Sequence, residues 1–261
     1  MQEPGRIALI TGASSGIGEA FARQLAAGGW QLILVARRLD RLEKIGREIA
    51  DQGLPSPRVL IADLTEEAAL AMVEQLIRDE GSLELLVNNA GFGMSGYFTK
   101  IDYEKHLQMI QLHVIASVRL THAALPAMIS RKRGAIINVS SVAAFVPWGN
   151  VTYNATKAYL VTFSEALSAE LRQKGVRIQA LCPGYTTTEF HDTPELGRLR
   201  SYPLPRWLWF TPEKVVRESI KALAQNKIIC IPGFTYKVVA GLGRNGLTSP
   251  LLRYFVIRFK K

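Results

Sequence analysis

Hydrophobic positions along the chain follow two different periods. Short runs rich in isoleucine, valine and leucine alternate with longer segments in which apolar residues recur every three or four positions. The short runs predict buried strands, and the longer segments predict helices with one apolar face. The predicted strands cover residues 6–11, 31–36, 57–64, 83–91, 134–141, 176–184 and 228–233; the predicted helices cover 15–28, 40–52, 66–80, 101–130, a segment around 153–157 and 211–226.

This alternation predicts a single α/β domain. Seven apolar strands separated by helices require a parallel sheet with helices on both faces. Right-handed crossovers then give a doubly wound, Rossmann-type arrangement. Because no internal repeat, low-complexity segment or linker divides the sequence, we expect residues 1–261 to form one domain with a seven-stranded parallel sheet.

One segment, residues 188–212, breaks the alternation. It is rich in proline and aromatic residues, as in "RSYPLPRWLWF", and has no clear period. The segment is either a surface loop or a substrate lid, and we favour a lid because long loops beyond strand ends usually serve a site. Its aromatic side chains favour a lipophilic substrate, since ligand pockets are largely apolar.

The composition is ordinary for a globular protein, with 48% hydrophobic and 21% charged residues. Cys182 and Cys230 lie in apolar runs, which favours buried, reduced thiols and a cytoplasmic location over a disulfide framework. The N-terminus shows no signal-peptide pattern, and no uninterrupted apolar run reaches the roughly 18–20 residues of a membrane-spanning helix.

The formal net charge of +10 is concentrated at the C-terminal end. Seven of the cations, and no acidic residue, lie in residues 227–261, which include a basic and apolar extension at 234–261. Its last part, "PLLRYFVIRFKK", either lies on an anionic membrane surface or packs on the lid or another subunit with its charges in solvent. Nucleic acid is not an expected partner, because the charge is local and no recognised binding module is present.

A glycine-rich turn joins the first predicted strand to the first helix. Gly12, Gly16 and Gly18 in "TGASSGIG" permit a tight turn whose backbone N–H groups approach a pyrophosphate at the helix N-terminus. Ser14 and Ser15 add hydroxyl donors. A turn of this composition without a ligand is the alternative, but the strand–turn–helix context favours dinucleotide binding.

The end of the second predicted strand bears on which dinucleotide binds. An acidic residue there would accept hydrogen bonds from the adenosine ribose and favour NAD. The chain has Arg37 and Arg38 instead, and guanidinium groups pair well with phosphate. We therefore expect NADP(H), the alternative being that both arginines are solvated surface charges.

Five motifs in order resemble the short-chain dehydrogenase/reductase family. They are "TGASSGIG" (11–18), "NNAG" (88–91), "NVSS" (138–141), "YNATK" (153–157) and "CPG" (182–184). The resemblance covers about residues 5–190 closely and implies a Rossmann-type reductase, usually a dimer or tetramer. It also implies cofactor contacts from Gly12, Ser14, Ser15, Gly16, Ile17, Gly18, Arg37, Arg38, Asp63, Leu64, Asn89, Ala90, Gly91, Tyr153, Lys157, Pro183, Gly184, Thr186 and Thr188.

The resemblance assigns catalysis to Tyr153 and Lys157. Helical surfaces often carry such a pair without any function, but in this family the tyrosine is the general acid that protonates the carbonyl oxygen. An ordinary phenol has a pKa near 10 and is a poor acid at neutral pH. We expect Lys157, one helical turn away, to lower that pKa and to hold the nicotinamide ribose.

Two positions depart from the family pattern. The carbonyl-orienting serine is Ser141 by strand register but Ser140 by counting back from Tyr153, and we choose Ser141 because loops absorb deletions more easily than strands. His113 stands where the family usually has an asparagine of a proton relay. It is either part of a modified relay or a packed helix histidine.

The remaining histidines, His106, His122 and His191, have no partners at ligand spacing, so no catalytic metal is expected. The leading hypothesis is an NADPH-dependent reductase of a lipophilic ketone or aldehyde, such as a 3-oxoacyl compound or another lipid ketone. The alternatives are a catalytically silent NADPH-binding sensor or scaffold and a membrane-surface adaptor that uses the C-terminal tail.

Overall fold

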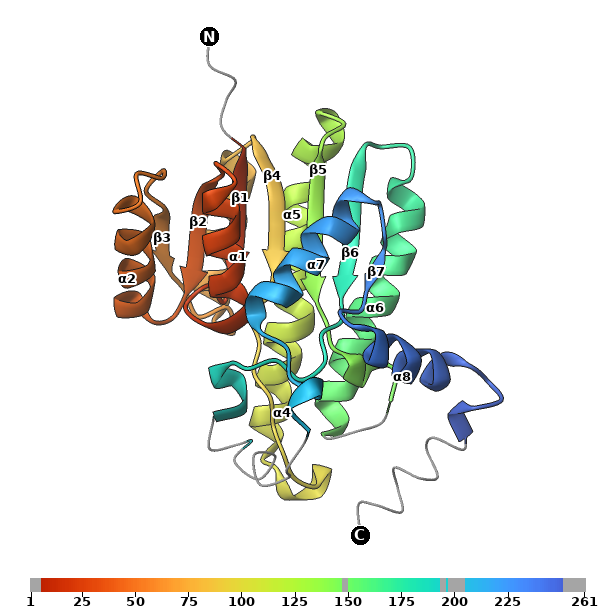
Figure 1. Ribbon diagram of the computed structural model, residues 1–261. Helices are drawn as coiled ribbons and strands as arrows, with labels where there is room; N and C mark the ends of the chain where they lie inside the picture. Colours follow the sequence, from red (N-terminus) through yellow and green to blue (C-terminus); the bar gives the residue numbers. More distant parts are fainter. Residues whose placement is uncertain (1–5, 147–149, 193–195, 197–204, 251–261) are drawn as a thin grey trace.

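The computed structural model describes residues 6–146, 150–192, 196 and 205–250. Within these ranges, seven strands form one parallel sheet in the order β3-β2-β1-β4-β5-β6-β7 (Figure 1). The strands are β1 (Ile7–Thr11), β2 (Gln31–Ala36), β3 (Arg58–Ile61), β4 (Leu83–Asn88), β5 (Gly134–Val139), β6 (Val176–Leu181) and β7 (Ile229–Cys230). The predicted α/β class and seven-stranded parallel sheet are confirmed.

Helices cover both faces of the sheet. One layer consists of α1 (Gly16–Ala27), α2 (Leu39–Ala50) and α7 (Pro212–Ala224), and the other includes α3 (Glu67–Asp79), α5 (Ala116–Ser130) and α6 (Val151–Leu171). Alternate residues of a strand point to opposite faces, so Ala8 and Ile10 pack in the first layer while Leu9 packs in the second. This double burial explains why the strands are continuous apolar runs.

The predicted helix at 101–130 consists of three parts. The helix α4 (Tyr103–Ile110) continues through a π-helical turn at Gln111–Ile115 into α5. The stretch Tyr103–Ser130 is long and apolar enough to cross a membrane by composition alone, with a mean hydropathy of 1.3. The most apolar 18 residues of this stretch are 44% buried inside the protein, and α5 packs on β4 and β5. Packing against the sheet therefore accounts for its apolar composition.

Five predicted strands extend past the carboxyl ends of the observed ones: β7 ends at Cys230, and the other four are β3, β4, β5 and β6. These four strands end at Ile61, Asn88, Val139 and Leu181. The residues that follow these ends leave the sheet and lie along its carboxyl edge, where parallel α/β sheets place their ligands.

The C-terminal part contains a helix that was not predicted, α8 (Phe234–Arg244). It lies beyond β7, at the lower right of the molecule in Figure 1. Residues 251–261, on which the predicted membrane-binding tail falls, lie outside the described residues, as do 193–195 and 197–204 of the predicted lid.

Both cysteines are buried free thiols, Cys182 directly after β6 and Cys230 at the end of β7. Leu181 pairs with Cys230, and the backbone N–H of Cys182 donates to the carbonyl oxygen of Cys230 at 2.7 Å. Burial raises the pKa of each thiol to about 12. The predicted buried, reduced state of the two cysteines is confirmed.

Candidate active site

A cleft of about 690 Å³ opens at the carboxyl edge of the sheet. It collects residues that follow β3, β4, β5 and β6, together with those of the glycine turn. Among the described residues, Gly18 and His113 are the predicted site residues that do not line it. The predicted residues that do line it are Gly12, Ser14, Ser15, Gly16, Ile17, Arg37, Arg38, Asp63, Leu64, Asn89, Ala90, Gly91, Ser141, Tyr153, Lys157, Pro183, Gly184, Thr186 and Thr188.

The glycine turn has the backbone that its sequence predicts. Gly12 and Gly16 have φ angles of +64° and +58°, a region that side chains disfavour. A Cβ on Gly12 would lie 2.8 Å from Cα of Ala90, so the turn and the loop after β4 approach closely. Gly18 lies behind the turn, where a Cβ would lie 2.3 Å from the carbonyl oxygen of Gly12. It therefore serves packing rather than ligand contact.

Hydrogen bonds join the turn to the loop after β4. The Thr11 hydroxyl oxygen accepts from the backbone N–H groups of Asn89 and Ala90 at 2.9 and 3.0 Å. The Asn89 side chain donates in return to the Thr11 carbonyl oxygen at 2.9 Å. The N-terminus of α1 faces this cradle, which suits a pyrophosphate because unpaired N–H groups and the helix dipole favour an anion.

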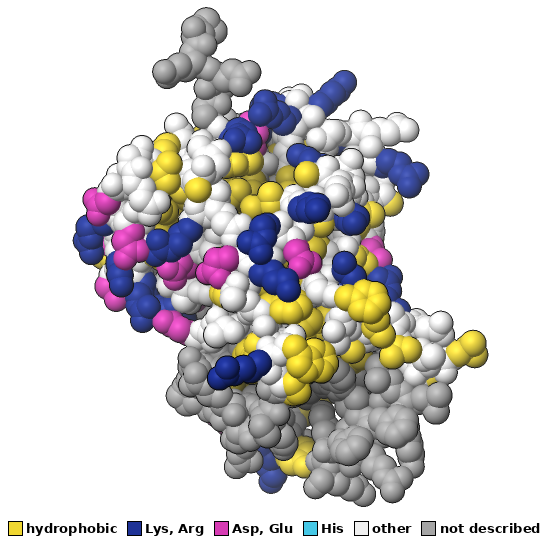
Figure 2. Space-filling model, in the orientation of Figure 1, with side chains coloured by type: hydrophobic (Ala, Val, Ile, Leu, Met, Phe, Trp, Pro, Cys, Tyr) yellow, Lys and Arg dark blue, Asp and Glu magenta, His cyan; other side chains and the backbone are white. Residues whose placement is uncertain are grey.

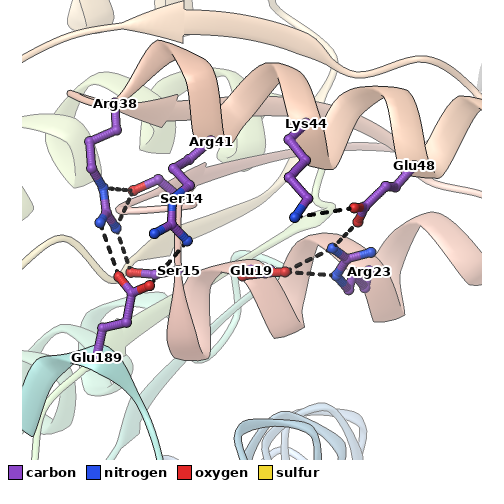
Figure 3. Close-up of polar contacts among 9 residues, drawn as sticks. All are labelled: Ser14, Ser15, Glu19, Arg23, Arg38, Arg41, Lys44, Glu48 and Glu189. Atoms are coloured by element: carbon purple, nitrogen blue, oxygen red, sulfur yellow. Dashed lines mark hydrogen bonds and ion pairs between the residues drawn. The ribbon is translucent and has the colours of Figure 1, made fainter. Parts of the chain in front are cut away.

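The two arginines after β2 lie in different environments. Arg38 donates to the Ser14 hydroxyl from Nε and Nη2, at 3.2 and 3.1 Å, and to the Ser15 hydroxyl from Nη2 at 2.9 Å (Figure 3). Arg37 is 72% exposed and forms an ion pair with Asp63 at 3.4 Å. Arg38 is therefore part of the cradle, whereas Arg37 borders its outer rim.

Tyr153 and Lys157 lie in the first turns of α6. The helix begins where the side chain of Asn150 accepts a hydrogen bond from the Tyr153 N–H at 3.0 Å, an N-cap that the sequence analysis missed. The Lys157 Nζ donates to the carbonyl oxygen of Val139 at 2.8 Å and lies 5.6 Å from the Tyr153 ring centre. Both side chains face the cleft.

The two candidate serines point in different directions. The side chains of Ser141 and Tyr153 are hydrogen-bonded to each other, and the Ser141 oxygen also accepts from the Ala143 N–H at 3.1 Å. Ser140 is 2% exposed and donates to the carbonyl oxygen of Lys157 at 2.6 Å. The structure therefore places Ser141, the residue chosen from strand register, beside the phenol.

The pKa values of the pair differ from the expectation. Burial raises the pKa of Tyr153 to about 12, and the hydrogen bond from Ser141 only partly opposes it. Burial also lowers the pKa of Lys157 to about 8. The expected lowering of the phenol pKa is thus not found in this structure, because desolvation disfavours the charged form of each group.

His113 lies behind the cleft, in the π-helical turn. Its Nε2 accepts from the Phe92 N–H at 3.1 Å, which places the ring proton on Nδ1, 2.9 Å from the Thr156 hydroxyl. Thr156 donates in turn to the carbonyl oxygen of Tyr153 at 2.9 Å. Burial and the charge of Lys157 hold the His113 pKa well below its ordinary value. A neutral histidine with both nitrogens engaged fits a packed, positioning role.

The substrate end of the cleft is largely apolar. Phe92, Met94, Tyr185, Phe190 and Leu196 line it, and the Phe190 ring lies 6.0 Å from that of Tyr153. Phe92 and Met94 lie in the loop after β4, within three residues of "NNAG", and the sequence analysis did not use them.

The described ends of the predicted lid lie beside each other. The N–H of Phe210 donates to the carbonyl oxygen of Tyr185 at 3.0 Å, and the N–H of Thr187 donates to the carbonyl oxygen of Phe210 at 2.9 Å. The residues just before the predicted lid are thus hydrogen-bonded to a residue near its end.

Comparison with known proteins agrees with this site. The family model described as short chain dehydrogenase matches residues 6–196. The chain therefore belongs to the short-chain dehydrogenases, oxidoreductases that act on CH–OH groups and whose fold binds NAD or NADP.

Three similar proteins bear on function. A short-chain dehydrogenase from Sphingobium yanoikuyae, solved with NADPH, is 34% identical (TM-score 0.81; 94% of this chain and 95% of that one). A bulky-bulky ketone specific alcohol dehydrogenase from Comamonas testosteroni is 31% identical (TM-score 0.80; 94% of each chain). The inactive hydroxysteroid dehydrogenase-like protein 1 of Homo sapiens is 33% identical over 72% of this chain, which covers 58% of that protein's length.

Proposed function

We propose that the protein is an NADPH-dependent reductase of a lipophilic ketone or aldehyde. The observation that carries the proposal is the convergence of Ser141, Tyr153 and Lys157 at one end of a cleft whose other end is a phosphate cradle. A general acid beside an apolar pocket, at one end of a dinucleotide groove, fits carbonyl reduction.

Tyr153 supplies the proton in this reaction. A nicotinamide held in the cleft would supply the hydride that the carbonyl carbon receives. The phenol, which is protonated at neutral pH, transfers its proton to the carbonyl oxygen and completes the alcohol. Ser141 is placed to orient that oxygen, and solvent later restores the phenol proton.

Lys157 acts through position and charge. Its amine is fixed to the end of β5 by the hydrogen bond to Val139, on the same helix face as the phenol. A cation there stabilises the phenolate that remains after proton transfer, since opposite charges in a buried site attract strongly. The lysine therefore favours the product of the proton transfer even though burial keeps the resting phenol protonated.

The cradle supports NADP over NAD. Arg38 spans the glycine turn and faces the cleft where an adenosine phosphate fits, and the similar dehydrogenase from Sphingobium yanoikuyae was solved with NADPH. The apolar wall formed with Phe190 and Leu196 supports a bulky, lipophilic substrate. The similarity to an alcohol dehydrogenase named for bulky ketones points the same way.

A panel of aliphatic, cyclic and acyl ketones, run with NADPH and NADH in parallel, tests the proposal. We expect NADPH oxidation with at least one lipophilic ketone, and its loss in Tyr153→Phe. The competing function is a silent NADPH-binding sensor, which the name of the inactive human relative favours. Tight NADPH binding without turnover on any member of the panel would support that function instead.

Peripheral membrane contact is a second proposal for the C-terminal part. Phe234, Val238 and Leu242 are 80%, 45% and 40% exposed and recur every fourth residue along one face of α8. Figure 2 shows hydrophobic side chains gathered at the lower right of the described surface, over α8. Co-sedimentation with anionic liposomes tests this, and Phe234→Ser/Val238→Ser should reduce binding relative to the unsubstituted chain.

A further inference from the structure

A single carboxylate joins two arginines beside the phosphate cradle (Figure 3). One oxygen of Glu189 lies 3.0 Å from Nη1 of Arg38, and the other lies 3.1 Å from Nη1 of Arg41. Arg38 is the N-cap of α2 and Arg41 lies in its first turn. Two cations three residues apart on a helix face the same side, so they form a forked site that an anion with several oxygens can bridge.

Glu189 reaches this site from the opposite side of the cleft. It follows Thr188, whose methyl group covers the glycine turn: a Cβ on Gly16 would lie 2.9 Å from it. The short helix Glu189–Asp192 belongs to the predicted lid. The carboxylate therefore connects the start of the lid to the wall that carries the cofactor-selecting arginine.

The arginine side of this contact is held in place. Arg38 keeps three hydrogen bonds to Ser14 and Ser15. Arg23 of α1 forms ion pairs with Glu19 of its own helix and with Glu48 of α2, which joins the two helices (Figure 3). The Arg38 guanidinium thus stays beside the glycine turn whether or not Glu189 remains, and α2, which carries Arg41, stays joined to α1.

We propose that Glu189 takes the place of the 2′-phosphate in the cofactor-free protein, and that Arg41 is a further phosphate-binding residue next to Arg38. The inference rests on the proposed NADPH preference, and it adds Glu189 and Arg41 to the residues that set that preference. Binding of a 2′-phosphate displaces the Glu189 carboxylate from both arginines. A ligand without that phosphate leaves the contact intact.

The relative charges favour this exchange. The carboxylate carries one negative charge and its pairs with the arginines are about half exposed, since the three side chains are 44%, 44% and 46% exposed. Exposed ion pairs of this kind are weak, whereas a phosphate monoester carries a charge of about −1.5 to −2 and three acceptor oxygens. The phosphate therefore binds the two arginines more strongly than the Glu189 carboxylate does. Because the phosphate must displace that carboxylate, the affinity of the protein for the ligand is reduced.

Dissociation constants measured by titration calorimetry test the proposal without any turnover. The probes are NADPH, NADH, 2′,5′-ADP and 5′-AMP. In Glu189→Gln, NADPH and 2′,5′-ADP should bind about three- to tenfold more tightly, a range set by the strength of exposed ion pairs. NADH and 5′-AMP should change less than about twofold. In Arg41→Ala, the two probes that carry a 2′-phosphate, NADPH and 2′,5′-ADP, should bind more weakly, and NADH and 5′-AMP should not.

Asp40→Asn is the matched control. Asp40 is an exposed acidic residue between Arg38 and Arg41 in sequence, so its substitution makes the same change in charge close to the site. Equal tightening in Asp40→Asn and Glu189→Gln would show a general charge effect and overturn the proposal. Equal tightening of NADPH and NADH in Glu189→Gln would overturn it as well. A failed ketone panel would leave the binding result standing.

Discussion

The Lys157 amine lies 5.6 Å from the centre of the Tyr153 ring and donates its hydrogen bond to the carbonyl oxygen of Val139. The lysine is thus held to the sheet while it faces the ring of the proposed acid. Burial of this pair favours neutral forms of both groups. A charged lysine inside the domain has consequences for stability that depend on pH.

Stability should increase with pH between about 8 and 10.5. Burial lowers the pKa of Lys157 from 10.5 to about 8, so across this window the unfolded chain binds a proton that the folded protein does not. Below pH 8 the buried charge destabilises the fold. The free energy of unfolding of wild type, relative to Lys157→Met, should therefore rise from pH 7.5 to pH 10. Urea denaturation at both pH values measures it, and a constant difference would contradict the lowered pKa.

Tyr153→Phe should lower turnover by about 10²- to 10⁴-fold, the range for loss of a general acid. The affinity for NADPH should stay within about twofold, because the ring and its packing are retained. Steady-state kinetics and NADPH fluorescence titration measure the two quantities. Tyr159→Phe is the control: this tyrosine lies on the same helix, stacks on Phe163 and is outside the cleft lining among the described residues.

Ser141→Ala should mainly reduce turnover, whereas Ser140→Ala should mainly reduce stability. Ser141 is hydrogen-bonded to the phenol, so its loss should reduce kcat, by about 10²-fold or more if it orients the carbonyl. Ser140 is buried and bonded to the α6 backbone, so its loss should lower the unfolding free energy by about 1–3 kcal/mol with little change in kcat. Kinetics beside thermal denaturation separates the two, and the reverse pattern would restore Ser140 as the catalytic serine.

His113→Asn should destabilise the protein without shifting the pH dependence of turnover. The substitution leaves Phe92 or Thr156 without a well-placed partner, which costs about 1–3 kcal/mol in a buried site. Because burial and the charge of Lys157 hold the His113 pKa well below its ordinary value, this histidine stays neutral near pH 7 and adds nothing to the pH dependence of turnover. His106→Asn, at another buried and doubly bonded histidine, is the control for stability alone. A displaced pH profile in His113→Asn would assign the histidine to the relay.

Arg38→Ala should reduce the preference for NADPH over NADH far more than Arg37→Ala. Hydrogen bonds to charged groups contribute about 1.5–3 kcal/mol, which corresponds to about ten- to a hundredfold in affinity. Arg38 lies across the cradle, whereas Arg37 is largely exposed and turned to Asp63. Comparison of dissociation constants for the two cofactors checks this, and equal effects of the two substitutions would contradict the difference in placement.

Much of the fold and of the cleft could be predicted because the residues that form them also leave a recognisable pattern in the sequence. The apolar runs fix the strands, and the glycines need left-handed backbone that other residues disfavour, as at Gly12 and Gly16. The strand register also pointed to Ser141. In these cases a local physical constraint leaves few alternatives.

The rest depends on contacts between distant segments. The pairing of Glu189 with Arg38 and Arg41 joins positions about 150 residues apart, which no local pattern indicates. The pKa of Tyr153 depends on how deeply the whole domain buries the phenol, and the spacing to Lys157 gives no measure of that depth. The helix α8 was missed because apolar residues lie on more than one of its faces: Tyr236 and Ala240 are buried, whereas Phe234 and Val238 are exposed.

The two cysteines give the protein an internal reporter of unfolding. Cys182, directly after β6, and Cys230, at the end of β7, are joined by a backbone hydrogen bond, have almost no solvent contact and have thiol pKa values of about 12. Thiolates react and thiols do not, so alkylating reagents reach these sulfurs only when the last strands of the sheet open. The rate of labelling therefore records how often that edge separates, with no added probe.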